Sequence, residues 1–71
     1  MNDAQHRNDV VWKILREATR PLTSLDICRQ INEPWAMYAP NYPNTAAVSA
    51  VLKRIGAEKV KRGLWIAPIK D

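Results

Sequence analysis

The chain has 71 residues, 46% of them hydrophobic, with five Pro, two Gly, one Cys and a formal net charge of +4. This length predicts one domain, residues 1–71, that is too small for a deep catalytic cavity. A single His and a single Cys argue against a zinc site or an internal disulfide, and the sequence has no run of about 18 uncharged apolar residues for a membrane span.

The N-terminal segment, residues 1–8, is polar, and we expect it to be a frayed terminus. It lacks the apolar run of a secretory signal, so we expect a cytoplasmic protein. A helix is expected from Asp3 or Asn8 to Ala18, because apolar residues recur there at three- and four-residue spacing: Val11, Ile14, Leu15 and Ala18, with Val10 beside them. Pro21 ends this helix, and a short extended segment at Leu22 follows.

A second, short helix is expected to about Ile31. It begins at Thr23-Ser24-Leu25-Asp26, which has the pattern of a capping box, with a hydroxyl followed three residues later by a carboxylate. The side chains expected to face inward are Leu25, Ile27, Cys28 and Ile31. On that face Cys28 is expected to be a small buried apolar residue and not a reactive thiol.

The connection 32–43 should be an ordered loop. Pro34, Pro40 and Pro43 exclude a long helix, but three of the five aromatic residues lie here, and a disordered linker would not be so aromatic. One helical turn is expected near Trp35–Tyr38. Two roles stay open: a lid over a small core, or a contact surface for a partner chain or for DNA.

A third helix is expected over 44–55, capped by Asn44 or Thr45 and stopped by Gly56. A helical wheel places Val48, Val51, Leu52 and Ile55 on one side. The opposite side carries Ala46, Ser49, Ala50 and Lys53, with Thr45 and Arg54 at the flanks.

A hairpin is expected over 57–68. A two-residue turn at Arg62-Gly63 would pair Lys61 with Leu64 and Lys59 with Ile66, which puts charged and core side chains on one face. We therefore expect a three-residue loop, Lys61-Arg62-Gly63, which pairs Val60 with Leu64, aligns Ile66 beside them and places Gly63 in the left-handed conformation that such loops need. This region also holds the charge excess: residues 53–71 have six basic and two acidic side chains, whereas residues 1–52 have five of each. A localised basic surface is typical of proteins that bind polyanions.

This order of elements resembles that of the winged helix-turn-helix DNA-binding domain. The resemblance covers about Val10 to Ile69: the stretch 21–28 is similar to the opening of the second helix in small bacterial and phage transcriptional regulators, 44–55 to the recognition helix, and 60–66 to the wing. The departure is the 12-residue connection 32–43, where a tight helix-turn-helix has about three or four residues.

The resemblance implies an α+β fold with a three-helix core and a C-terminal wing. It also implies sequence-dependent binding of double-stranded DNA and a role as a transcriptional regulator. Such a protein would be located at the nucleoid when it is bound to DNA. The third helix would lie in the major groove, and its base-contacting residues would be Thr45, Ala46, Ser49 and Ala50. The wing tip would lie on the backbone or in the minor groove, and the backbone-contacting residues would be Thr23, Ser24, Lys53, Arg54, Lys59, Lys61 and Arg62. Without an outward Arg, Asn or Gln in its first two turns, this helix should have modest sequence specificity.

Partners and alternatives follow from the same residues. We expect the protein to act alone or as a homodimer, through the aromatic residues of 32–43 or through Trp12 and Trp65, although Trp12 is better explained as core. No cofactor, metal, membrane or small-molecule substrate is expected. Enzymatic activity is disfavoured, because His6 lies in the polar terminus and there is no pair of acidic residues or glycine-rich phosphate loop. A winged-helix module that binds another protein is the alternative, and RNA remains open as the nucleic acid.

Overall fold

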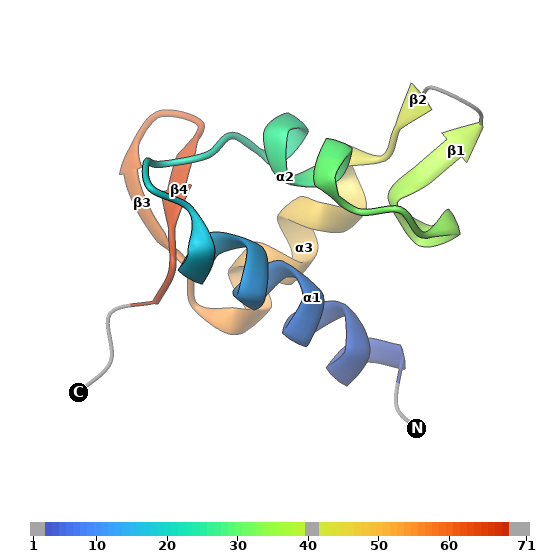
Figure 1. Cartoon of the computed structure of the whole chain (residues 1–71), viewed down its shortest axis with the longest axis horizontal. Helices are drawn as coiled ribbons and strands as arrows, with labels where there is room; N and C mark the ends of the chain where they lie inside the picture. Colours follow the sequence, from blue (N-terminus) through green and yellow to red (C-terminus); the bar gives the residue numbers. More distant parts are fainter. Residues whose placement is uncertain (1–2, 40–41, 69–71) are drawn as a thin grey trace.

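The computed structural model describes residues 3–39 and 42–68, and within them the chain forms an α+β domain with three helices and two small antiparallel hairpins (Figure 1). Some predictions concern residues outside these ranges. They are the fraying of residues 1–2, the proline at Pro40, the charge of Lys70, and Ile69, where the resemblance to a winged helix ends. The elements are α1 (Asp3–Glu17), α2 (Ser24–Gln30), the 3₁₀ turn η1 (Pro34–Ala36), β1 (Met37–Ala39), β2 (Tyr42–Pro43), α3 (Thr45–Ile55), β3 (Glu58–Lys61) and β4 (Leu64–Ile66).

The first helix begins at Asp3, the earlier of the two predicted starts. Residues 3–8, which were also expected to fray, form the first turns of α1 instead. Tertiary contacts explain the difference, since the side-chain oxygen of Asn8 accepts a 2.7 Å hydrogen bond from Nε of Arg54 in α3. The C-terminal end agrees with the prediction, because α1 stops at Glu17, four residues before Pro21.

The core lies where the three helices meet. Its buried members are Val11, Leu15, Leu22, Ile27, Cys28, Ile31, Ala36, Val48, Val51 and Leu52. Other expected core residues, such as Ile14 and Ile55, are partly buried against it, whereas Leu25 and Trp12 are exposed, at 37% and 40%. The guanidinium of Arg16 covers the Trp12 ring at 4.9 Å from its centroid, so a cation–π contact on the surface replaces burial.

The N-terminal end of α2 is capped as the sequence predicts. The Thr23 hydroxyl accepts a hydrogen bond from the backbone N–H of Asp26, and the Asp26 carboxylate accepts one from the backbone N–H of Thr23, which completes the predicted capping box. Just before this cap, Leu22 exchanges two backbone hydrogen bonds with Trp65 of β4, of 2.8 and 2.9 Å. The extended segment at Leu22 therefore adds a third strand position to the β3–β4 hairpin.

The caps of α3 are also those predicted. The side-chain oxygen of Asn44 accepts a hydrogen bond from the N–H of Ala47, and Gly56 ends the helix in the left-handed conformation, at φ 76°. The N–H of Ala57 then reaches the carbonyl of Leu52, which satisfies one of the last carbonyls of the helix.

The connection 32–43 is more regular than a loop. The expected helical turn is present as η1, and it is followed by the β1–β2 hairpin, in which Met37 pairs with Pro43 and Ala39 with Tyr42. Asn44 closes the base of this hairpin: its N–H donates to the carbonyl of Ala36 at 2.8 Å, and its side-chain amide donates to the carbonyl of Trp35 at 3.2 Å.

The register of the β3–β4 hairpin differs from the prediction. Lys61, and not Val60, pairs with Leu64, so the turn consists of Arg62 and Gly63 alone. The next pair toward the base is Lys59 with Trp65, and the irregularity between Lys59 and Lys61 falls at Val60, which is 46% exposed. The left-handed conformation expected for Gly63 is present, at φ 79°.

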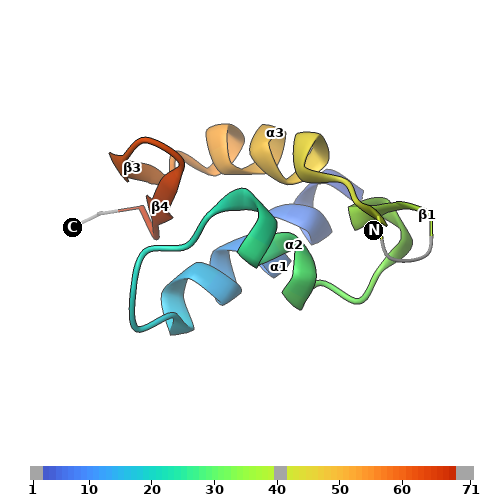
Figure 2. The same cartoon turned by 90° about the horizontal axis from the view of Figure 1, so that it is seen from above.

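The two hairpins lie at opposite ends of α3. Figure 2 shows the helix along one side of the molecule, with the β3–β4 hairpin beyond its C-terminal end and β1 beyond its N-terminal end. In Figure 1 both hairpins project toward the top of the view, on either side of α2. The long connection between α2 and α3 thus places a second projecting element next to the third helix.

Candidate nucleic-acid interface

The open strip of α3, defined here as Ala46, Ala50 and Lys53, is its exposed face away from α1 and α2. Two methyl groups make the first two turns of this strip narrow, and an ammonium group stands in the last turn. These three residues fall on the outward side that the wheel predicts.

Ser49 and Thr45, the other two base-contacting candidates, are half-buried at the edge of the open strip. The Ser49 hydroxyl lies 3.1 Å from the hydroxyl of Ser24, the first residue of α2. This contact crosses the α2–α3 interface, so both hydroxyl groups already have a protein partner. Only one of the two O–H groups is used in this contact, so the pair still offers one O–H donor and the remaining lone pairs to a ligand.

The N-terminal end of α2 offers little to a phosphate. The Thr23 hydroxyl oxygen is engaged in the helix cap, and the carboxylate of Asp26 lies within the same cap. A negative charge at this position repels a second anion. The geometry therefore favours a structural role for Thr23.

Arg54 points away from the open strip. Its guanidinium donates to the side-chain oxygen of Asn8 at 2.7 Å and to the backbone carbonyl of Ala4 at 3.5 Å. The side chain thus ties the last turn of α3 to the first turns of α1. Its charge lies on the α1 side of the helix, apart from Lys53.

The β3–β4 hairpin presents three exposed cations. Lys61 is the last residue of β3 and Arg62 is in the turn, so both stand at the tip. Lys59 lies nearer the base, where its ammonium group is 5.3 Å from the centroid of the Trp65 ring. Trp65 in turn packs against the core, so this contact also holds the stem of Lys59 on the hairpin face.

Residues 34–57 contain no Asp and no Glu. This stretch comprises η1, the β1–β2 hairpin and the whole of α3, and the carboxylates that flank it are Glu33 and Glu58. The feature is readable from the sequence, and the fold adds that β1 lies beyond the N-terminal end of α3 (Figure 2). The stretch holds Lys53, and the hairpin that follows it carries three exposed cations beside the single carboxylate of Glu58. Such an excess of positive charge is typical of a surface that attracts a polyanion.

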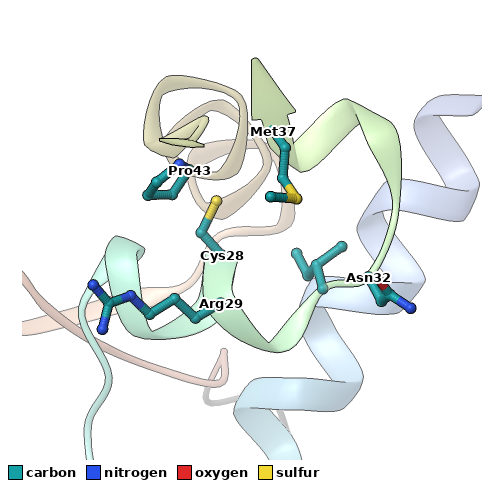
Figure 3. A pocket seen from close by; sticks show the side chains of 6 residues that line it. Cys28, Arg29, Asn32, Met37 and Pro43 are labelled. Carbon is teal, nitrogen blue, oxygen red and sulfur yellow. The ribbon is translucent and has the colours of Figure 1, made fainter. Parts of the chain in front are cut away.

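A surface pocket of about 510 Å³ lies between α2 and the β1–β2 hairpin, and it is lined by Cys28, Arg29, Ile31, Asn32, Met37 and Pro43 (Figure 3). The Cys28 thiol donates to the carbonyl of Ala36 at 3.0 Å. Burial raises the pKa of the Cys28 thiol, although a backbone hydrogen bond involving Asn44 partly opposes the shift. A protonated, buried thiol is a poor nucleophile, so Cys28 packs as the sequence predicts and gives this pocket no reactive group.

Glu33 joins the N-terminal half of α1 to η1. Its Oε1 atom lies 2.7 Å from Nε2 of His6 and accepts a 3.0 Å hydrogen bond from Nε1 of Trp35. The hydrogen bond with His6, and secondly the one from Trp35, lower the pKa of the Glu33 carboxyl. On the same tryptophan, the guanidinium of Arg7 stacks 5.1 Å from the ring centroid. His6 is therefore part of a contact between α1 and the segment that leads into the β1–β2 hairpin.

This contact predicts an acid-sensitive component of stability. Because folding lowers the pKa of Glu33, its stabilising contribution is complete above the ordinary value of 4.5 and is lost as the pH falls through the folded value. We expect Glu33→Gln to lower the urea midpoint at about pH 6, and the difference from the wild type to shrink at lower pH. Urea unfolding at a series of pH values measures it, with Glu17→Gln as the control for loss of a surface carboxylate. A difference that stays constant down to about pH 3 would contradict the assignment.

Within the described residues no helix is long and apolar enough to cross a membrane, and no group of three or more His, Cys, Asp or Glu side chains is arranged to hold a metal ion. Comparison with family models, curated proteins and solved structures gave no match.

Proposed function

We propose that the chain is a winged-helix protein that binds double-stranded DNA and acts as a small transcriptional regulator. In this proposal α3 is the recognition helix and the β3–β4 hairpin is the wing. The observation that carries it is the combination of the slim open strip of α3, which ends in Lys53, with the exposed cations Lys61 and Arg62 at the tip of the hairpin beyond the C-terminal end of that helix.

The dimensions of α3 suit a major groove. Its 11 residues correspond to an axis of about 16 Å, and a groove about 12 Å wide admits an α-helix. Ala46 and Ala50 let the helix backbone approach the base edges closely, and their methyl groups can contact thymine methyl groups. Lys53 in the last turn would then face the phosphates that border the groove.

Sequence discrimination by this helix should be modest. Apolar contact with thymine is weaker than a bidentate hydrogen bond from Arg, Asn or Gln, and the open strip carries none of these. Ser49 and Thr45 can add hydrogen bonds at the strip's edge, but the Ser49 hydroxyl is shared with Ser24. The remaining preference would come from groove shape and from the phosphate contacts that set the register.

The salt dependence of binding tests the proposal. Contacts from Lys53, Lys61 and Arg62 to three phosphates predict a slope of about −2.7 in a plot of log affinity against log salt. A threefold rise in salt should then weaken binding about twentyfold. Fluorescence anisotropy with a labelled random duplex at several salt concentrations measures the slope, and a protein-free fluorophore control corrects for salt effects on the dye. Lack of binding at low salt, or binding that salt does not weaken, would reject the proposal.

A further inference from the structure

We propose that the β1–β2 hairpin is a second DNA-contacting element, in which the hydroxyl groups of Tyr38 and Tyr42 donate hydrogen bonds to phosphates beside the N-terminal end of α3. The inference rests on the proposed function and adds a site to it. It assigns a role to the departure from a tight helix-turn-helix, the long connection between α2 and α3.

The first support is exposure. Tyr38 is 66% exposed and Tyr42 is 63% exposed, the highest values among the large hydrophobic side chains in the described residues. Their rings contact each other, with centroids 5.8 Å apart and planes tilted by 51°. This contact limits the movement of both rings, so the two phenol groups stand in the solvent as one preformed unit and lose little entropy on binding.

The second support is the rigid attachment of the hairpin to α3. The side-chain oxygen of Asn44 caps α3 through the N–H of Ala47, while the N–H and the amide of the same residue bond to the carbonyls of Ala36 and Trp35. One residue therefore holds the base of the hairpin and the first turn of α3 together. A ligand that meets the N-terminal end of α3 also meets the hairpin.

The third support is position. The hairpins lie at opposite ends of α3 in both views (Figures 1 and 2). Since the axis of α3 is about 16 Å long and the major groove is about 12 Å wide, elements at both ends of an inserted helix come close to the two bordering backbones. The tip of the β3–β4 hairpin, with Lys61 and Arg62, would contact one of these backbones, and the β1–β2 hairpin would contact the other.

The fourth support is charge. The hairpin lies inside the stretch 34–57, so it carries no carboxylate of its own, and the carboxylate that precedes the stretch, Glu33, is engaged by His6 and Trp35. A phenol hydroxyl donates a hydrogen bond to an anionic oxygen without adding charge of its own, and such charge-assisted bonds are among the stronger ones in proteins. The face thus has the donors and the electrostatics that a sugar–phosphate backbone requires.

The double variant Tyr38→Phe/Tyr42→Phe tests this role, because it keeps the ring pair and removes both hydroxyl groups. We expect it to bind a labelled duplex at least about tenfold more weakly than the wild type at low salt, as the loss of two charge-assisted hydrogen bonds predicts. The slope of log affinity against log salt should be unchanged, because no charge is lost. Trp12→Phe, at an exposed aromatic ring on α1, is the matched control and should bind like the wild type.

Two results would overturn the inference while the wild type still binds DNA. One is a folded Phe double variant with wild-type affinity for the duplex. The other result has two parts: the wild type self-associates in sedimentation at high salt, and Tyr38→Ser/Tyr42→Ser abolishes this association without weakening DNA binding. The β1–β2 hairpin would then be a contact between protein chains. If the wild type does not bind the duplex, the proposed function itself fails, and the two failures are thus distinguishable.

Discussion

Replacing Lys61 and Arg62 together by Ala is expected to weaken binding to duplex DNA at least about tenfold at low salt and to reduce the salt slope by about 1.8, since two phosphate contacts and their released counterions are lost. Both side chains stand at the exposed tip of the β3–β4 hairpin, so the change should not disturb the core. The loss should be equal for different duplex sequences, because phosphates carry no base identity. Anisotropy titrations with two unrelated duplexes measure both quantities.

The matched control removes the same charge from another surface. Lys13 and Arg16 are exposed on α1, which lies on the opposite side of the molecule from the open strip of α3 (Figure 2). Lys13→Ala/Arg16→Ala should lower the affinity much less. If both double variants weaken binding equally, net charge and not the hairpin tip attracts the DNA, and the assignment of the wing is rejected.

Leu52→Ala is expected to lower the free energy of unfolding by about 2 to 5 kcal/mol, the usual range for truncation of a buried Leu. Leu52 is fully buried in α3, where the helix packs against α1 and α2. A domain of this size has only a few kcal/mol of stability, so the variant should be largely unfolded at room temperature.

Circular dichroism with urea unfolding measures this loss. Val60→Ala removes a similar apolar group from an exposed position and is the control, with an expected change within about 0.5 kcal/mol. A Leu52→Ala variant as stable as the control would mean that α3 does not pack on the core as described.

The helix ends could be predicted because their signals are local. The capping box at Thr23 and Asp26, the cap at Asn44 and the left-handed Gly56 depend on residues within one helical turn, and all three are present. The inward faces of α1 and α3 follow from apolar periodicity for the same reason. Leu25 was misplaced because α2 is too short for periodicity to define a face.

The hairpins depend on contacts between distant residues. The β3–β4 register was predicted on the assumption that charged and core side chains occupy different faces, but the Lys59 side chain lies over the Trp65 ring, so the two kinds share a face. Pairing of Trp65 with Leu22, far away in sequence, brings that ring onto the core. The β1–β2 hairpin was not predicted because Pro43 excludes a helix and was therefore assigned to a loop. A proline is nevertheless tolerated at the end of a two-stranded ladder, where Pro43 pairs with Met37.

The residues of the candidate site were predicted from the faces that each element should expose. Contacts between elements show that some of these residues are free on the surface and that others bond to a neighbouring helix. Ala46, Ala50, Lys53 and the hairpin cations are exposed as expected. Ser49 meets Ser24 across the α2–α3 interface, and Arg54 meets Asn8 of α1, neither of which a wheel of α3 alone can show. Whether the exposed residues contact DNA stays a prediction.

The backbone bridge between Leu22 and Trp65 affects the dynamics of the β3–β4 hairpin. The amide protons of both residues are held in that bridge, so they exchange with solvent only when the hairpin separates from the α1–α2 connection. The tip at Arg62 and Gly63 lies beyond the bridge and can open alone. Hydrogen exchange should therefore divide the hairpin in two: the amides at its base should exchange slowly, together with those of the helices, and the amides at its tip should exchange fast.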